Sequence, residues 1–583
     1  MKDILFITPS PALSINLESN GTLLLATKLL HADFDVDILR LCQVESYHKD
    51  YESFIANAVT QISTMAPKCV SFYTLWPYYH VMIRMAQELR AKNPNMIIVF
   101  GGPQASATAE DTLAACQAVD YICSGEGENT VVPFFSALLR GKGSLNAIPG
   151  LYHRQGRKII HNDQLLPLCD LEDLPRWDDR LYADVYREPP EVLSSSNYYM
   201  PIDAGRGCPY NCTFCCTSYF WRRTYRLKSP QRIVSDIRFF NEKFGINSFW
   251  FSHDAFTTDR NLVSQVCDYI IESGLKITWK CSSRADCINE ELILKMKQAG
   301  LTEIEIGIET GSPRMQKLTH KNLNLDRVRQ MIRFLVSQGL YVSLFFMYGF
   351  PEETQEDLLQ TLELMFSLME EGVDKLGMFF CRFNPATQIT ADYIDNLVLD
   401  PNITVLSKSI FGYNEELELI RSNKALFPYF YHLKTPLRDE FQHLTYLIQI
   451  YQKFPKTGPI IRKLYNSDYM KMYRDFVAYN PSITSGSPEL VLRTASHPHE
   501  FLIAMLQGLD FPQRNQLAGR LTFEWDVQQV AKSEGDITIQ RTYPFSYVDF
   551  TLKRPIEAYT DASCEILLEN RNGKLSMKVL RPC

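Results

Sequence analysis

The sequence lacks any hydrophobic run of the roughly 18 residues that a membrane-spanning helix needs. It also lacks an excess of positive charge, because 60 Lys and Arg face 67 Asp and Glu, for a formal net charge of −7. That balance argues against a general nucleic-acid binder. Residues 1–9 are too short for the apolar core of a signal peptide, and we expect them to begin a first strand. These absences favour a cytoplasmic protein with no membrane and no nucleic acid among its partners.

A disulfide framework is not suggested either, because most of the 15 cysteines are scattered along a chain of 583 residues. A role as a small buried hydrophobe is the favoured interpretation of the scattered ones, which are Cys42, Cys69, Cys116, Cys169, Cys267, Cys381 and Cys564. The exception is the run from Cys208 to Cys216. Clustered cysteines in a large cytosolic protein suggest metal binding or catalysis.

The first part of the chain has the pattern of an α/β domain. Residues 1–145 alternate apolar, strand-like runs with helix-length segments, which predicts an N-terminal doubly wound parallel sheet. Strands are expected at residues 4–8, 36–41, 69–74, 96–100 and 120–123, with helices at 23–31 and 79–92 among the segments between them. Such sheets bind ligands at the carboxyl ends of their strands.

Glycines follow the last two of these strands. Gly101 and Gly102 come after the fourth strand, and Gly125 and Gly127, on either side of Glu126, come after the fifth. Glycine lets a backbone approach a bulky ligand closely. The same residues also suit plain tight turns, so the pattern alone leaves both interpretations open.

A second alternating series occupies residues 199–390, after a linker at 146–198 that contains a small hairpin. Its six strands are expected at residues 199–204, 248–252, 276–281, 303–309, 342–348 and 376–383. Helical patterns separate them, which predicts a central (β/α) partial barrel of six units. In such barrels the functional residues lie at the carboxyl ends of the strands.

The remainder, residues 391–583, is expected to form a C-terminal α+β domain that binds substrate or acts as a lid. Helices are predicted at residues 437–454 and 468–479, and strands near 521–525, 536–541, 548–553 and 574–580. This part carries no catalytic motif. The terminal Cys583 is expected to be a free end, with a metal ligand as the alternative role of its thiol.

The strongest chemical signal is the segment AGRGCPYNCTFC at residues 204–215, directly after the first strand of the second series. Its spaced thiols, Cys208, Cys212 and Cys215, can ligate three irons of a 4Fe-4S cluster, because thiolate is the usual iron–sulfur ligand. The fourth iron then stays open to a small molecule. A zinc site is the alternative, although no nearby fourth Cys or His has zinc-finger spacing. Cys216 follows directly, but neighbouring side chains diverge, so it is taken as a bystander.

This Cys-x3-Cys-x2-Cys loop resembles that of the radical S-adenosylmethionine (SAM) superfamily. Further matching residues lie at later strand ends and are Asp254 in FSHDAF, Ser283 and Arg284 in CSSRAD, Glu309 in IGIETGS, and the segment YGFPEET at 348–354. In that family the open iron chelates SAM, which an electron cleaves to methionine and a 5′-deoxyadenosyl radical. The resemblance implies that Ser283, Arg284 and Glu309 bind SAM and that Asp254 faces SAM or substrate. Ordinary ion pairs at the barrel rim are the alternative for Arg284 and Glu309.

A doubly wound domain before such a barrel resembles the cobalamin-dependent group of this superfamily. The matching segments are VFGGPQA at 99–105 and YICSGEGENT at 121–130, within a resemblance that covers residues 1–390. It implies that the cobalamin contacts include Gly101, Gly102, Gly125, Glu126 and Gly127. No Asp-x-His-x-x-Gly motif is present in this domain, so no histidine of that motif would ligate cobalt. Trp76 is expected at the lower face of the corrin, with plain packing as its alternative role.

By this resemblance the protein is a cobalamin-dependent radical SAM methyltransferase that acts on an unactivated carbon, or on phosphorus, of a natural-product or related small-molecule intermediate. Radical rearrangement or cyclisation without methyl transfer is the first alternative. A non-catalytic cobalamin or iron–sulfur sensor is the second. A peptide or a carrier-bound substrate also fits the pattern. An external electron donor such as flavodoxin or ferredoxin is the implied protein partner.

Overall fold

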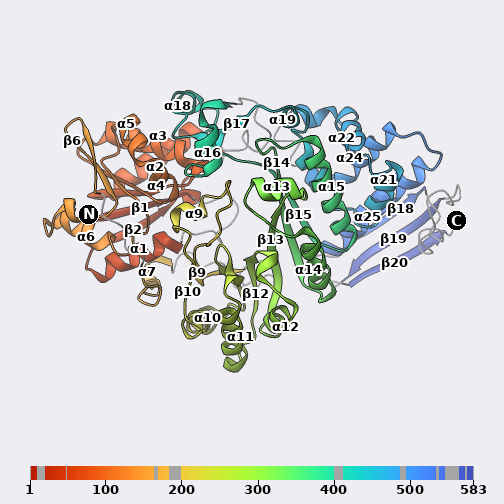
Figure 1. The fold of residues 1–583 in the computed structure, drawn as a ribbon, viewed down its shortest axis with the longest axis horizontal. Helices are drawn as coiled ribbons and strands as arrows, with labels where there is room; N and C mark the ends of the chain where they lie inside the picture. The colour runs from red at the N-terminus through yellow and green to blue at the C-terminus, as the bar shows by residue number, and fades with distance from the viewer. Residues whose placement is uncertain are drawn as a thin grey trace. The chain divides into compact units, whose positions relative to one another are not determined.

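The computed structural model describes residues 2–9, 20–47, 49–162, 169–182, 199–399, 411–485, 494–533, 537–544, 563–571 and 574–581. The chain divides into two compact units. The first comprises Met1–Gly307, Lys317–Leu335 and Cys381–Lys434, and the second comprises Ile308–Gln316, Val336–Phe380 and Thr435–Cys583. Elements carry the labels of Figure 1. Within the described residues, no helix is both long and apolar enough to cross a membrane.

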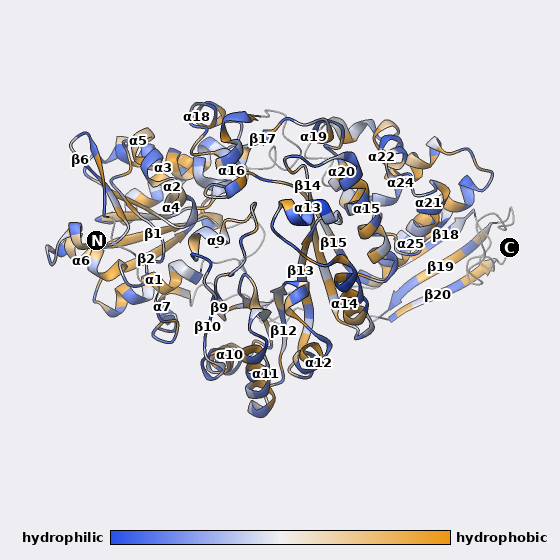
Figure 2. Cartoon of the chain, viewed as in Figure 1, coloured by the Kyte–Doolittle hydropathy of each residue, from blue (hydrophilic) through white to orange (hydrophobic). Residues whose placement is uncertain are grey.

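The first sheet has seven strands in the order β2-β1-β3-β4-β5-β6-β7. Their bounds are β1 Ile4–Thr8, β2 Val36–Arg40, β3 Cys69–Tyr73, β4 Ile97–Gly101, β5 Tyr121–Cys123, β6 Leu151–Gln155 and β7 Lys158–His161. Strands β1 to β5 pair in parallel. Their sequences are short, largely apolar runs (Figure 2). Such runs are typical of strands that are covered on both faces. The predicted doubly wound parallel sheet is confirmed.

Helices cover both faces of this sheet. They are α1 Asn20–His31, α2 Tyr51–Met65, α3 Tyr79–Lys92, α4 Pro103–Ala107, α5 Ala109–Ala115 and α6 Val131–Arg140. Helices α1 and α6 contact each other and share one hydrophobic core with β1, through residues such as Leu23, Phe134 and Phe6. Helices α2 and α3 form the second contacting pair. The alternate residue Ile7 of β1 is also fully buried, so both faces of the strand lie under side chains.

The hairpin of β6 and β7 extends the first sheet. The two strands are antiparallel, and β6 pairs with β5, so the sheet runs to His161, past the boundary expected at residue 145. Arg154 on β6 fastens the hairpin, because its guanidinium donates to the carbonyl oxygens of Val119 and Cys116 at 2.5 and 2.6 Å. The hairpin predicted within the linker is therefore an edge of the first sheet.

The central sheet has six strands in the order β15-β14-β13-β12-β11-β8. Their bounds are β8 Met200–Asp203, β11 Ser248–Ser252, β12 Thr278–Ser283, β13 Leu301–Glu309, β14 Tyr341–Tyr348 and β15 Lys375–Phe380. The intervening helices are α10 Pro230–Phe244, α11 Arg260–Ser273, α12 Glu290–Gln298, α13 Pro313–Leu318, α14 Leu325–Ser337 and α15 Gln355–Glu370. The division between the two units falls within β13. The six strands of this sheet are the six that the sequence pattern predicted.

Short elements complete the first unit. They are α7 Asp179–Tyr182, β9 Gly205–Arg206, α9 Thr217–Phe220, β10 Arg226–Leu227, α16 Gln388–Tyr393, β16 Leu397–Leu399, α18 Leu417–Ser422 and β17 Tyr431–Leu433. The segment that carries α18 packs on the first domain, because Glu416 accepts hydrogen bonds from Tyr51 and Arg84, each at 3.0 Å. Part of the expected C-terminal domain therefore belongs to the first unit.

The second unit contains the other C-terminal elements. They are α19 Pro436–Glu440, α20 Leu444–Tyr451, α21 Gly458–Leu464, α22 Tyr469–Ala478, α24 Pro498–Met505, α25 Arg514–Lys532, β18 Ile537–Tyr543, β19 Cys564–Arg571 and β20 Lys574–Arg581. The predicted α+β character is confirmed, with β18, β19 and β20 in one antiparallel sheet.

The strand expected at 521–525 is wrong, because these residues lie in α25. That helix is buried on most of its sides, from Leu517 to Val530, so its sequence lacks the one-sided periodicity that would have revealed it. Strand β19 was not predicted, and the strand expected at 548–553 and Cys583 lie outside the described residues.

Candidate functional site

The three spaced cysteines lie together on the loop between β9 and α9. Cys208, Cys212 and Cys215 are all half-buried, and the backbone N–H of Cys215 donates to the carbonyl oxygen of Cys212 at 3.1 Å. Burial raises the pKa of the Cys208 thiol to about 11, and the negative charge of the other two cysteines adds to this effect. Three spaced thiols on one loop suit an iron centre, which binds them as thiolates. Cys216 stands at the start of α9, where burial raises its pKa to about 12.

Backbone hydrogen bonds hold this cysteine loop in place. The carboxylate of Asp254, after β11, accepts from the N–H of Gly207 at 3.1 Å. The N–H of Thr213 donates to the carbonyl of Thr319 at 3.0 Å, and the carbonyl of Thr213 accepts from Ile389 at 3.1 Å. Thr319 and Ile389 were not predicted, because they follow no strand end and carry no motif.

Arg284, after β12, contacts the same loop with its guanidinium. The group lies 3.7 Å from the ring centroid of Tyr210 and 3.9 Å from the sulfur of Cys212. It also donates to the carbonyl of Lys321 at 2.9 Å and forms a two-pronged pair with Asp286 at 3.0 and 2.9 Å. Arg284 therefore makes an ion pair, which was the alternative role expected for it, and it also contacts the cysteine loop.

The other two expected SAM residues are both buried. Ser283 ends β12, contacts the hydroxyl of Thr257 and donates to the carbonyl of Arg284 at 3.1 Å. Glu309, in the second unit, ends β13 with a φ of 70°, a left-handed conformation that is uncommon for a residue with a side chain. The side-chain amide of Gln316 donates to the carbonyls on either side of Glu309, at 2.9 and 2.8 Å. Thr257 and Gln316 had no sequence signal.

A pocket opens among the strand ends of the first sheet. Its lining includes Tyr73 at the end of β3, Cys123 at the end of β5, and the four predicted glycines Gly101, Gly102, Gly125 and Gly127. In the order β2-β1-β3-β4-β5 the strand order changes direction between β1 and β3, and open α/β sheets bind ligands beside that point. The pocket therefore lies where this topology predicts a ligand.

Two of the glycines have no room for a side chain, because neighbouring protein atoms occupy the space beside them. Gly102 has a φ of 93°, and a Cβ there would lie 2.9 Å from the carbonyl oxygen of Thr74. A Cβ on Gly127 would lie 3.1 Å from Leu25. The four glycines present backbone to the pocket, which suits the close approach of a flat, bulky ring such as a corrin. The hydroxyl of Thr74 holds this backbone in place by donating to the carbonyl of Gly101 at 2.8 Å.

Glu126 and Trp76 are not among the residues that line this pocket. Glu126 accepts from the N–H of Cys169 at 2.9 Å and pairs with Arg206 at 3.3 Å and with Arg226. Burial opposes its charge, but the hydrogen bond from Arg226 and the other contacts outweigh burial and hold its pKa below the usual value. Trp76 stacks on Phe220 of α9, with ring centroids 6.3 Å apart and planes at 22°.

Two known families match this chain, one over the region of the pocket and one over the region of the cysteine loop. Residues 16–134 match the model of the B12 binding domain, and residues 202–365 match the model of the Radical SAM superfamily. The first match contains the pocket glycines, and the second contains the three cysteines.

Two curated relatives differ in the reactions that they are named for. An uncharacterized methyltransferase of Pyrococcus horikoshii, PH0819, is 27% identical over 61% of this chain and 77% of its own. The anaerobic magnesium-protoporphyrin IX monomethyl ester cyclase of Rubrivivax gelatinosus is 24% identical over 52% of this chain and 55% of its own. The chain thus spans little more than half the length of the second relative.

Two solved structures share the fold. The radical SAM methyltransferase TsrM of Kitasatospora setae, with cobalamin and a [4Fe-4S] cluster bound, is 15% identical with a TM-score of 0.52, over 68% of this chain and 75% of its own. The cobalamin-dependent SAM radical enzyme OxsB, with aqua-cobalamin bound, is 14% identical with a TM-score of 0.56, over 90% of this chain and 84% of its own. The likeness to OxsB reaches into the C-terminal part of the chain.

Proposed function

The chain belongs to the cobalamin-dependent group of the radical SAM superfamily, and from this premise we propose that it is a methyltransferase. The methyl acceptor is an unactivated carbon, or a phosphorus atom, of a natural-product or related small-molecule intermediate. When bound, the 4Fe-4S cluster and SAM supply the 5′-deoxyadenosyl radical, and cobalamin carries the methyl group. The protein positions these groups and excludes water, while the cofactors supply the reactive chemistry.

One observation carries the proposal: the glycine-lined pocket and the three-cysteine loop occur in the same compact unit. A radical enzyme without cobalamin would need only the cysteine loop. The pocket provides four glycines at the carboxyl ends of β4 and β5, which is where a corrin would rest against backbone. Methyl transfer to a carbon without a nucleophilic electron pair requires both a radical and a methyl donor, and the two sites provide for both.

The SAM site is proposed to use Ser283, Arg284 and Glu309. Ser283 ends β12, Arg284 follows it directly, and Glu309 ends β13, so each stands at the carboxyl end of a barrel strand. Arg284 has a second task in this proposal, because its contacts with Tyr210 and Cys212 orient the cysteine loop. Asp254 is proposed to face SAM or substrate, and it also holds the cysteine loop through Gly207.

Trp76 is proposed to shield the lower side of the cobalt. Its ring is held by stacking on Phe220, so it is fixed in direction. An indole offers cobalt no ligand atom, because its nitrogen is only a hydrogen-bond donor. With no ligand atom from Trp76, bound cobalamin would gain and lose a methyl group more readily.

The cobalamin domain is proposed at residues 1–145, the linker at 146–198, the barrel at 199–390 and the substrate domain at 391–583. The hairpin of β6 and β7 in the linker adds to the sheet of the first domain. The part of the substrate domain up to Lys434 belongs to the first compact unit. A small molecule is the favoured substrate, and a peptide or carrier-bound intermediate is compatible with the aromatic helices α20 and α22. A small electron-transfer protein such as flavodoxin or ferredoxin is the proposed partner, since SAM cleavage consumes an electron.

A second function is a radical cyclisation or rearrangement without methyl transfer. The relative named as a magnesium-protoporphyrin ester cyclase favours it, because that protein shares about half of this chain at 24% identity. The two functions differ in product mass, since only methylation adds a carbon atom.

The test uses SAM with a trideuterated methyl group. The reconstituted full chain is incubated anaerobically with this SAM, cobalamin, reductant and a small-molecule extract, and products are compared by mass spectrometry. We expect a new compound that carries the labelled methyl group in place of one hydrogen. Substrate consumption without label incorporation would favour the cyclase.

A further inference from the structure

A buried cluster of opposite charges links the pocket to the cysteine loop. Arg206 lies 2.7 Å from Glu128 and 3.3 Å from Glu126. Arg226 pairs with Glu126 through both oxygens, one of them at 3.3 Å. The side chains of the two glutamates are only 4% and 5% exposed. We call these four residues, Glu126, Glu128, Arg206 and Arg226, the Glu–Arg clamp.

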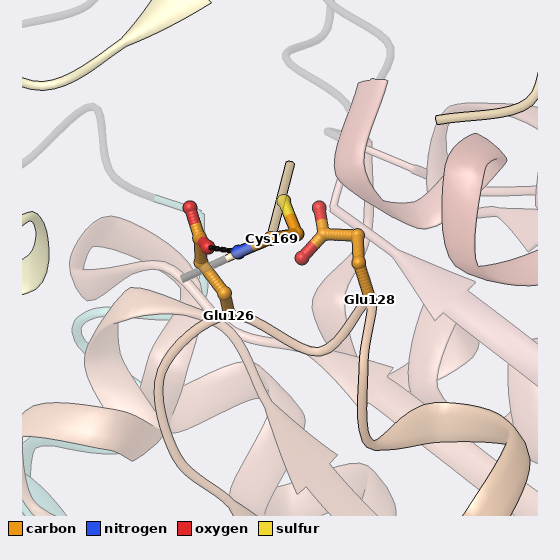
Figure 3. A group of neighbouring side chains, drawn as sticks. All are labelled: Glu126, Glu128 and Cys169. Atoms are coloured by element: carbon orange, nitrogen blue, oxygen red, sulfur yellow. Dashed lines mark hydrogen bonds between the residues drawn. The ribbon is translucent and has the colours of Figure 1, made fainter. Parts of the chain in front are cut away.

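The two glutamates and Cys169 are close enough to hold a metal ion, with one ligand atom from each within 4.8 Å of the others (Figure 3). The surrounding charges argue against that role. Arg206 already lies between the glutamates and approaches the sulfur of Cys169 at 3.7 Å. Two guanidinium groups supply the positive charge that a cation would bring.

The clamp joins elements that carry the two cofactor sites. Glu126 and Glu128 alternate with the pocket glycines Gly125 and Gly127 on the loop after β5. Arg206 stands two residues before Cys208, and Arg226 is its direct partner in the pairing of β9 with β10. A shift of the loop after β5 therefore acts on the strand that leads into the cysteine loop.

Neighbouring groups leave the clamp little freedom. Trp221 lies over both guanidinium groups, at 5.7 Å from Arg206 and 5.9 Å from Arg226. Glu126 also accepts from the N–H of Cys169, whose carbonyl accepts from Arg226 at 2.8 Å. Gly205 admits no side chain, because a Cβ there would lie 2.3 Å from the carbonyl oxygen of Arg226. The packed surroundings make the clamp a rigid link.

We propose that the Glu–Arg clamp couples the two sites, so that cobalamin binding and cluster loading favour each other. The proposal rests on the cobalamin assignment made above. Arg206 and Glu128 are positioning residues in it, and neither contacts a reacting atom. By linkage, cluster loading tightens cobalamin binding by the same factor by which cobalamin stabilises the cluster. Coupling between two sites in one protein is commonly about 5- to 150-fold.

The test measures the affinity for hydroxocobalamin of the full chain, by equilibrium dialysis, with and without its reconstituted cluster. The wild-type protein is expected to bind at least about 5-fold more tightly with the cluster present. Glu128→Gln, which removes one charge from the clamp, is expected to bring this ratio toward one while each cofactor still loads alone. Glu416→Gln is the matched control, because Glu416 is also a buried carboxylate paired with an arginine, Arg84, in the same unit.

Two further measurements keep the test decisive if Glu128→Gln does not fold. Arg206→Lys keeps the positive charge but cannot reach both glutamates, so an intermediate ratio is expected. In the wild type, the rate of cluster loss to an iron chelator, followed by absorbance, should fall when hydroxocobalamin is added. The same loss rate with and without hydroxocobalamin would contradict the coupling.

The outcomes separate this proposal from the cofactor assignment. Equal cobalamin affinities in the two wild-type states would overturn the coupling alone. A wild-type ratio preserved in Glu128→Gln would overturn the role of the clamp. A wild-type protein that binds no cobalamin in either state would overturn both the coupling and the assignment on which it rests.

Discussion

The carboxylate of Asp254 accepts a hydrogen bond at 3.1 Å from the backbone N–H of Gly207, the residue immediately before Cys208. Asp254 follows β11 and Gly207 follows β9, so this contact ties two strand ends to the start of the cysteine loop. Burial raises the pKa of Asp254 despite this hydrogen bond, which means that the protein keeps a carboxylate at a site that disfavours its charge. A side chain kept under those conditions has a positioning task.

Replacement of Asp254 by alanine should therefore reduce cluster content several-fold after reconstitution, because the loop loses its acceptor. Asp254→Asn should retain most of the cluster, since an amide oxygen still accepts from Gly207. Iron and sulfide analysis after anaerobic desalting measures the effect. Asp259→Ala is the control: it removes the N-cap of α11, at a cost of about 1 kcal/mol, without touching the loop. Equal cluster content in Asp254→Ala and wild type would contradict the role of Asp254 in positioning the cysteine loop.

Replacement of a predicted cluster ligand should lower cluster content more than replacement of the adjacent cysteine, Cys216. Cys212→Ala should lose the 4Fe-4S absorbance and all 5′-deoxyadenosine formation, because two thiolates cannot hold the cubane with one open iron. Cys216→Ala should keep both, since Cys216 starts α9 and is not one of the three spaced thiols. Absorbance and chromatography of the same samples provide the comparison. Loss of the cluster in Cys216→Ala with retention in Cys212→Ala would reverse the ligand assignment.

The pocket glycines predict a separate phenotype. Gly102→Ala should weaken cobalamin binding at least about tenfold, because its Cβ would press on Thr74 and its φ of 93° disfavours alanine. Cluster content should stay near the wild-type level. Gly141→Ala is the matched control, as Gly141 also has a positive φ, 65°, but has no heavy atom within 4 Å of its would-be Cβ. Equal corrin retention in both variants would argue that the ligand binds elsewhere.

A pH-dependent prediction concerns the stability of the second unit. Asp357 lies in the first turn of α15. It accepts hydrogen bonds from Ser312 at 2.5 Å and from Thr354 at 2.6 Å, and it pairs with Arg314 at 2.5 Å. Burial opposes its charge, but the hydrogen bonds from Arg314, Ser312 and Thr354 outweigh burial and hold its pKa far below the usual value. Asp357→Asn should cost about 1–3 kcal/mol near neutral pH.

The direction of the pH dependence follows from the lowered pKa of Asp357. The stabilisation by the ionised carboxylate is complete above the unfolded pKa of about 4 and is lost as the pH falls toward the folded pKa. The difference in thermal midpoint between wild type and Asp357→Asn should therefore shrink between pH 5 and pH 3. Glu356→Gln, at an exposed neighbouring position, should show no such trend. A constant or growing difference at low pH would contradict this account of Asp357.

The sequence was sufficient for most elements and for the cysteine loop, because strand and helix periodicity and the Cys-x3-Cys-x2-Cys spacing are local signals. It was insufficient where distant segments meet. Nothing in the sequence links Thr213 with Thr319, or Glu128 with Arg206, since each contact depends on how loops pack after the strands have formed. Helix α25 was missed for a related reason, because burial on most sides removes the polar face that marks a helix.

The most direct test of the central claim is anaerobic reconstitution of the full chain, followed by incubation with SAM, cobalamin and a strong reductant. The account predicts 5′-deoxyadenosine in the wild-type sample, none in Cys212→Ala, and a corrin spectrum that stays with the wild-type protein after desalting. Deoxyadenosine without retained corrin would contradict the cobalamin assignment. A protein with an intact cluster that forms no deoxyadenosine and retains no corrin would contradict the account as a whole.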